Sequence, residues 1–260
     1  MEESLLEPGR AVKVSQVPEA GRATRHSAWG RVVLVSAILV LGALVALVAS
    51  DLATRREELV TYPVGGAIAG LSFDLGDAGV EVVGGGPARE VDVQRRERSA
   101  FGHAPTTTRS VSGGTFMVKS RCPTEVLRSC SVSYRVVVPD NLPIDIRTDG
   151  GEVRFRGYRG SANITTQSGD IDVTDFCGFS LDARAESGDI STNWSCPPQR
   201  LSLRAGSGAV HAVVPSGPYQ VDAESASGRN VVRGITATSE APFSIQALST
   251  SGDVVVEGRR

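Results

Sequence analysis

The residues "SGDI" occur at 168–171 and again at 187–190, and "SGDV" follows at 251–254. They belong to a longer series of glycines, spaced by 18, 19, 20, 20 and 24 residues. The glycines of the series are Gly151, Gly169, Gly188, Gly208, Gly228 and Gly252. A period near twenty residues is typical of repeat proteins, in which each repeat stacks on its neighbours.

Apolar and polar residues alternate around these glycines. Seven positions before them stand Ile144, Ala162, Leu181, Leu201, Val221 and Ile245, and two positions after them stand Val153, Ile171, Ile190, Val210, Asn230 and Val254. Such alternation is typical of strands with one buried face. Each repeat is predicted to form a strand, a tight corner, a strand and a looser return. The predicted fold is all-β, a single-chain β-solenoid over residues 141–260 with about twenty residues per coil.

Each residue of the Ser-Gly-Asp corner has a predicted role. Glycine supplies the backbone angles of a sharp bend, and the serine hydroxyl can satisfy an N–H group of the corner. The aspartate is expected to point outward. The repeat at 229–230 has Arg-Asn in place of Asp-Ile, so a bulge or a slipped register is expected there.

The four cysteines form no C-x-x-C pair, which argues against a zinc site or a thioredoxin-like redox motif. Cys177 and Cys196 each stand eight residues after the glycine of their repeat. Neighbouring strands lie about 4.8 Å apart, within the Cα distance of a disulfide. We predict that Cys177–Cys196 links two coils and that Cys122–Cys130 closes a local loop.

Residues 32–50 read "VVLVSAILVLGALVALVAS", nineteen residues without a charge. A helix of this length spans roughly 28 Å, close to the hydrocarbon thickness of a bilayer. The segment is longer than the apolar region of a cleaved signal peptide and lacks an A-x-A site. It is predicted to be an uncleaved transmembrane signal anchor.

The flanking charges predict the orientation of this helix. Lys13, Arg22, Arg25 and Arg31 precede it, whereas Arg55 and Arg56 follow it among acidic residues. Cytoplasmic flanks carry the excess of Lys and Arg. Residues 1–31 are therefore predicted to be a short cytoplasmic head, and the domain after the helix is predicted to be extracytoplasmic, where disulfides persist.

Residues 51–70 are predicted to form a stalk and residues 71–140 a β cap on the first coil. Segments such as "EVDVQ" and "SVSYRVVVP" alternate without the twenty-residue period, and caps of this kind shield exposed edges. At the other end, "VVVEGRR" at 254–260 is expected to leave the last coil bare. Either its charged residues protect that edge, or the edge pairs with a partner.

The segment "VSYRVVVPDNLPIDIRTDGGEVRFRG" at 132–157, followed by "TTQSGDIDV" and "AESGDIST", resembles a bacterial putative-adhesin family of unknown function. The resemblance covers roughly residues 71–260. It implies a Gly-rich β-solenoid behind a transmembrane helix and a role at the cell surface or in the envelope. It supplies no catalytic residues.

Several function classes are disfavoured. A net charge of −2 and a pI near 6.0 argue against a nucleic-acid binder, and no nucleic-acid partner is predicted. Asp170 and Asp189 share a column that could hold Ca²⁺, but Ala209 and Arg229 interrupt it, and Ca²⁺ needs several oxygen ligands. No metal and no cofactor is predicted.

Catalysis is not predicted either. The outward acidic and basic residues Asp145, Asp182, Asp222, Arg147, Arg184 and Arg204 could supply a polysaccharide-cleaving site, which needs a carboxylate pair. They are interpreted instead as a charge ladder across the coils. The sequence has no G-x-S-x-G and no H-E-x-x-H motif.

The remaining hypothesis is a single-pass membrane protein with an extracytoplasmic binding or adhesion-type module. A solenoid offers long regular faces to extended ligands such as surface glycans, the cell wall or a strand of another envelope protein. The alternative is a sensory or regulatory subunit of an envelope-stress system that signals through its transmembrane helix.

Overall fold

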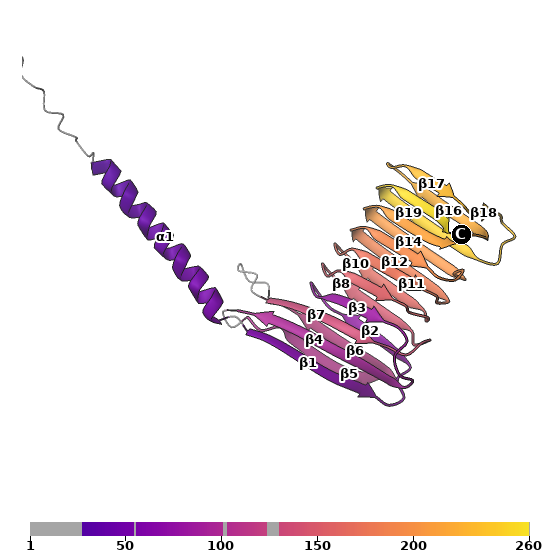
Figure 1. Ribbon diagram of the computed structural model, residues 1–260, viewed down its shortest axis with the longest axis horizontal. Helices are drawn as coiled ribbons and strands as arrows, with labels where there is room; N and C mark the ends of the chain where they lie inside the picture. Colours follow the sequence, from indigo (N-terminus) through magenta and orange to yellow (C-terminus); the bar gives the residue numbers. More distant parts are fainter. Residues whose placement is uncertain (1–27, 55, 101–102, 124–129, 260) are drawn as a thin grey trace, which may run out of the picture. The chain divides into compact units, whose positions relative to one another are not determined.

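The protein is described here by a computed structural model that covers residues 28–54, 56–100, 103–123 and 130–259 (Figure 1). Residues 1–27 of the predicted cytoplasmic head lie outside the described residues. Helix α1 (Ala28–Thr54) contains the predicted apolar segment. Its part Val33–Ser50 is long and apolar enough to cross a membrane, judged by length and composition. Residues 49–260 form a separate compact unit.

This compact unit consists of two sheets, A and B, to which most coils contribute one strand each (Figure 1). Sheet A has the order β1 (Arg56–Gly65), β4 (Glu90–Ser99), β7 (Cys130–Val137), β3 (Gly79–Val83), β9 (Val153–Arg156), β11 (Ile171–Phe176), β13 (Ile190–Trp194), β15 (Val210–Pro215), β20 (Val254–Arg259), β17 (Asn230–Arg233). Sheet B has the order β18 (Thr236–Ala237), β16 (Pro218–Ser225), β19 (Ser244–Ser251), β14 (Arg200–Ser207), β12 (Ser180–Ser187), β10 (Ala162–Thr166), β8 (Ile144–Thr148), β2 (Gly70–Asp74), β6 (Thr115–Arg121), β5 (Thr106–Ser112). Strands β1, β4 and β5 pair antiparallel, whereas the other described neighbours pair in parallel.

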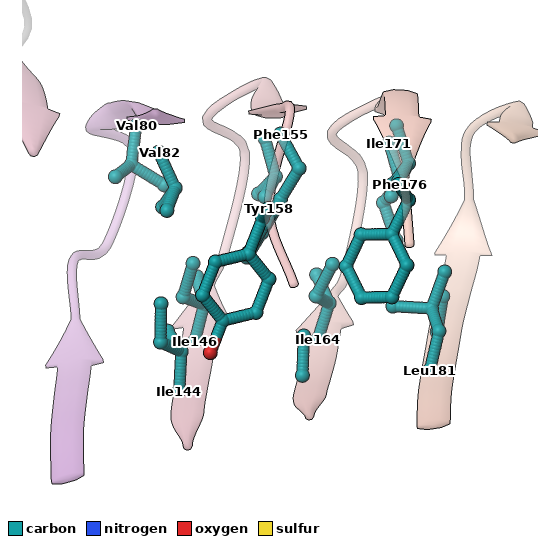
Figure 2. Packing of buried hydrophobic residues seen from close by; sticks show 14 of the residues in the cluster. Val80, Val82, Ile144, Ile146, Phe155, Tyr158, Ile164, Ile171, Phe176 and Leu181 are labelled. Atoms are coloured by element: carbon teal, nitrogen blue, oxygen red, sulfur yellow. The ribbon is translucent and has the colours of Figure 1, made fainter. Parts of the chain in front are cut away.

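The inner faces of the two sheets form one continuous apolar core (Figure 2). In sheet B the register aligns Ile144, Ala162 and Leu181 on consecutive strands, and all three are buried. In sheet A it aligns Val153 and Ile171 in the same way. The predicted inward columns and the predicted solenoid are therefore confirmed.

Aromatic rings fill the core beside the looser returns. Phe155, Tyr158, Phe176 and Trp194 make successive edge-on or tilted contacts, with the centroids of Phe176 and Trp194 4.6 Å apart. The Tyr158 hydroxyl donates to the carbonyl of Leu142. Burial raises the pKa of the Tyr158 phenol well above its usual range, so this side chain stays neutral within the core.

The corner glycines are stacked so closely that no side chain fits between them. A Cβ on Gly188 would lie 2.5 Å from the carbonyl oxygen of Gly169, and a Cβ on Gly208 would overlap the carbonyl oxygen of Gly188. Gly208 also has a φ of 155°, which L residues rarely adopt. The glycine is therefore required by the approach of the neighbouring coil as well as by the bend itself.

The corner aspartates bind the backbone of the adjacent coil. Asp170 Oδ1 accepts the N–H of Asp189 at 2.9 Å, and Asp189 Oδ1 accepts the N–H of Ala209 at 2.7 Å. Asp253 Oδ1 accepts the N–H of Arg229 in the same way at 2.9 Å, and hydrogen bonds from the Arg229 side chain and backbone lower the pKa of Asp253. The exposed aspartate thus joins coils, a role that the sequence did not reveal.

The role predicted for the corner serine belongs to another residue. Gly169 donates its N–H to Thr166 Oγ1 at 2.8 Å, and Gly151 donates to Thr148 Oγ1 at 3.0 Å. The hydroxyl of Ser168 instead donates to the carbonyl of Asp149 at 3.0 Å. The threonines stand three residues before the glycine and are buried, so their hydroxyls lie inside the bend.

The coils are not stacked in chain order at the C-terminal end. Strands β19 and β20 lie between the coil of β14 and β15 and the coil of β16 and β17. The expectation of a bare edge at 254–260 is therefore wrong for β20, which is paired on both sides. The outermost coil is formed by residues 218–233.

The register at 229–230 is also regular. Asn230 pairs with Val254 and Val231 with Val255, without a slip. The predicted bulge is absent from this pairing because Asn230 lies in the outermost coil, where its side chain is exposed. A register shift occurs instead in β11, between Val173 and Phe176, where Asp175 has a φ of 53°.

The predicted stalk and cap need correction. Within residues 51–70, β1 pairs antiparallel with β4 along its whole length, from Arg56 to Gly65. Within residues 71–140, β2 and β3 pair in register with β8 and β9. The solenoid thus begins at β2. The twenty-residue period is not visible in the sequence at this point, because residues 84–137 separate the first coil (β2 and β3) from the next coil (β8 and β9).

The structure joins Cys122 to Cys130 and Cys177 to Cys196, with Cα–Cα distances of 5.7 and 5.1 Å. These are the pairs that the sequence predicts. The second disulfide joins the returns of two consecutive coils, those of β11 and β13.

Replacing Gly208 with Ala is expected to lower the free energy of unfolding by about 3 kcal/mol, because the methyl group cannot fit against the Gly188 carbonyl. Gly217→Ala is the matched control, since its Cβ would meet nothing closer than 3.7 Å, and should change stability by no more than about 1 kcal/mol. Urea denaturation followed by circular dichroism measures both. Equal stability of the two variants would contradict the stacking argument.

Replacing Cys177 and Cys196 together with Ser is expected to lower stability by about 3 kcal/mol, because the unfolded chain loses a cross-link. The same change at Cys122 and Cys130 should cost less, since that link spans 8 rather than 19 residues. Denaturation curves give the stabilities, and the intact mass after alkylation without reductant gives the thiol count. Four alkylated cysteines in the exported parent protein would refute both links.

Candidate binding groove

Polar side chains form a row across the outer face of sheet B. The register aligns Ser72, Asp145, Asn163, Asp182, Ser202, Gln246 and Asp222 on consecutive strands. Asn163 Nδ2 donates to Asp145 Oδ2 at 2.6 Å, and Gln246 Nε2 donates to Asp222 Oδ2 at 2.9 Å. Each of these amide side chains therefore binds a carboxylate of the adjacent coil.

The ion pairs on this face run along strands rather than across them. Arg147 lies 3.5 Å from Asp145, and Arg184 lies 2.9 Å from Asp182. Residues two apart in a strand point to the same face, which accounts for both pairs. The predicted cross-coil charge ladder is therefore replaced by ion pairs within strands and amide links between coils.

A groove runs over the starts of the strands on this face. One hollow of about 530 Å³ is lined by Ser72, Asp145, Asn163 and Asp182, with Arg200 at its end. It extends from Thr115 in β6 to the first residue of β14, so it crosses several coils. Its lining combines apolar residues with the polar row, and it includes the carboxylates of Asp145 and Asp182 and the guanidinium of Arg200.

A second hollow of about 540 Å³ continues the first, because the two share Ser180 and Arg200. It is lined by Phe179, Gln220 and Phe243. We call the two hollows together the sheet-B groove. Its length follows the solenoid axis, which suits an extended ligand rather than a single small molecule.

Phe179 is the most exposed aromatic side chain among the residues whose burial is described, with 54% of its surface accessible. It stands before β12, in the return that begins after Phe176. Sequence reasoning missed it because one phenylalanine in a loop looks like part of the core. The available signal was its place in a return, outside the alternating columns.

A further hollow of about 480 Å³ lies on the outer face of sheet A, and its charges are already paired. Glu81 lies 2.7 Å from Arg135 and 2.9 Å from Arg156. Arg154 pairs with Glu152 at 2.5 Å. Asp145 and Asp182 of the sheet-B groove are paired as well, but that groove also contains the exposed ring of Phe179, which makes it the better candidate for binding.

The described residues hold no group of three or more His, Cys, Asp or Glu side chains that could bind a metal ion. Asp170 and Asp189, which share a column in the sequence, use their carboxylates to bind the adjacent coil. The six corner glycines stack along one edge in the order Gly151, Gly169, Gly188, Gly208, Gly252 and Gly228. They shape the solenoid and lie outside the groove.

The geometry defines an all-β solenoid protein with a groove along one sheet. Residues 142–257 match the family described as Toastrack DUF4097. The match covers less than half of the chain, and the function of that family is unknown. None of the curated proteins matches the chain.

Solved structures with similarity to the chain share little sequence with it. One is a putative cell adhesion protein from Clostridium sporogenes, with 12% identity over 78% of this chain and 100% of its own, at a TM-score of 0.44. Another is a putative adhesin from Bacteroides fragilis, with 10% identity over 78% of this chain and 97% of its own, at a TM-score of 0.42.

Phe179→Ala is expected to leave the free energy of unfolding within about 0.5 kcal/mol of the parent, because the ring is exposed. Phe176→Ala, three residues away, removes a ring that is fully buried and should cost about 3–5 kcal/mol. Thermal or urea unfolding distinguishes the two. A large loss of stability in Phe179→Ala would mean that this ring supports the fold and is not free for a ligand.

Proposed function

We propose that this chain is a single-pass membrane protein whose extracytoplasmic solenoid binds an extended hydrophilic polymer, such as a surface glycan, along the sheet-B groove. The observation that carries the proposal is the continuous groove, which contains a row of polar side chains and the exposed ring of Phe179. No residue is assigned a catalytic role.

The length of the groove favours a polymer. It passes over β6, β2, β8, β10, β12 and β14, and neighbouring strands lie about 4.8 Å apart, so these strands span about 24 Å. A ligand with repeating units would meet a similar environment at each coil.

The chemistry of the lining favours a polymer rich in hydroxyl groups. Asp145, Asn163 and Asp182 offer hydrogen-bond acceptors, and Arg200 offers donors at the junction of the two hollows. The exposed face of Phe179 offers an apolar platform of the kind that binds the less polar face of a ring.

The membrane anchor and the compartment rest on separate features. Segment Val33–Ser50 could cross a bilayer, and the basic residues before it favour a cytoplasmic N-terminus. Both disulfides lie after this helix, and disulfides persist in extracytoplasmic compartments.

The test is binding of the full chain, in detergent micelles, to arrays of surface glycans and to purified cell-wall polymers. Phe179→Ala should weaken binding about tenfold, which corresponds to about 1.4 kcal/mol. Leu59→Ala is the matched control, because Leu59 is 59% exposed and lines the hollow on sheet A. It should leave affinity unchanged.

Two outcomes would overturn the proposal. One is the absence of saturable binding to any surface polymer, which would favour a sensory or regulatory role with a protein partner. The other is binding that Leu59→Ala weakens and Phe179→Ala does not, which would move the site to sheet A.

A further inference from the structure

The two ends of the solenoid differ in how well they cover the apolar core. At the end formed by β1 and β5, Arg109 lies over the ring of Tyr62, 4.4 Å from its centroid. Tyr62 and Val64 also pack against the core. Antiparallel strands and this cation–π contact therefore close that end.

The opposite end, formed by β16 and β17, is open. Val232 is 41% exposed, whereas Val256 and Ala212, its neighbours in the same column, are fully buried. Val221 and Ala223 on β16 are likewise only partly buried. The inward apolar residues of the outermost coil are thus only partly covered, and the apolar core is open to solvent at this end.

Backbone groups at this end are also without strand partners. Among the described residues, no strand pairs with the outer edge of β17, and β18 covers β16 only at Pro218 and Tyr219. Residues 220–225 and 230–233 therefore present strand edges without a neighbouring strand, although the Ala223 carbonyl accepts a hydrogen bond from Asn230 Nδ2. Such edges are sites for pairing with another chain.

The two free edges carry opposite charge. Outward side chains on β16 include Asp222 and Glu224, and outward residues on β17 include Arg233, with Arg229 directly before the strand. The short connection at residues 226–229 reverses the chain, so β17 runs opposite to β16. The end coil thus contains an acidic edge and a basic edge of opposite direction.

We propose that two copies of this chain associate end to end through these edges, with β17 of each copy pairing antiparallel with β16 of the other. A two-fold axis along the strands produces both pairings at once, as in an isologous dimer. It places the basic edge of one copy against the acidic edge of its partner and continues the apolar core across the junction.

The charges agree with this arrangement. The two-fold axis keeps each residue's position along the strand, so Glu224, next to the corner in β16, lies beside the partner's Arg229, which stands directly before β17. Arg229 already pairs with Asp253 at 2.6 Å, so charges alternate in sign across the junction. The arrangement that pairs β16 with its own copy would instead oppose acidic residues, and like charges across strands are destabilising. The second copy is therefore oriented by the charges of the end coil.

The experiment measures the association of the full chain in detergent micelles by analytical ultracentrifugation, over a series of protein concentrations. A reversible dimer is expected. Arg229→Glu should weaken it at least about tenfold, because the symmetry places each reversed charge at two contacts of the dimer. Glu224→Arg should weaken it similarly, and the two changes together should restore most of the affinity.

Arg147→Glu is the matched control. Arg147 and Arg229 are both exposed and both pair with a carboxylate, but Arg147 lies in β8, inside sheet B. This variant should dimerise like the parent. A monomer at all concentrations would overturn the proposal, as would a dimer that Arg229→Glu leaves intact, or two weakened single variants whose combination restores no affinity.

Discussion

The contact between the carbonyl oxygen of one corner glycine and the α-carbon of the next determines the rest of this structure. Because no Cβ separates Gly188 from Gly169 or Gly208 from Gly188, the coils approach to strand-pairing distance at the corner as well as along the sheets. The parallel register of both sheets then follows, and with it the alignment of every inward and outward column. The aspartate after the glycine strengthens the same contact by accepting an N–H from the neighbouring coil.

Much of the fold could be predicted from the sequence because the constraint repeats. Each coil must place apolar residues on one face and glycine at the corner, so Ile144, Ala162 and Leu181 occupy one column in the sequence and in the structure. The stacking order of the coils could not be predicted. The aligned sequence positions show which residues face inward, but they do not show which two coils lie next to each other. The exposed position of Asn230 shows that its departure from the aliphatic column marks the end of the stack.

The candidate site was less visible in the sequence for a related reason. The outward residues Asp145, Asn163 and Asp182 follow the alternation of the strands, so they could be placed on one face. Phe179 lies in a return, which varies in length and follows no period. Its exposure depends on how the chain leaves β11, where the register shifts after Val173. The groove thus combines a predictable polar row with an aromatic residue that only the structure places.

The insertion of β19 and β20 between two earlier coils has a consequence for the order of assembly. Residues 218–233 have no sheet neighbour in the preceding coil, since β14 and β15 pair with β19 and β20 instead. During synthesis this coil therefore cannot join the sheets, and its apolar face stays uncovered, until residues 244–259 have been made and have paired with β14 and β15. The last two coils then fold as a single cooperative unit, so a chain interrupted within this segment would lose both coils together and expose the core at β14 and β15.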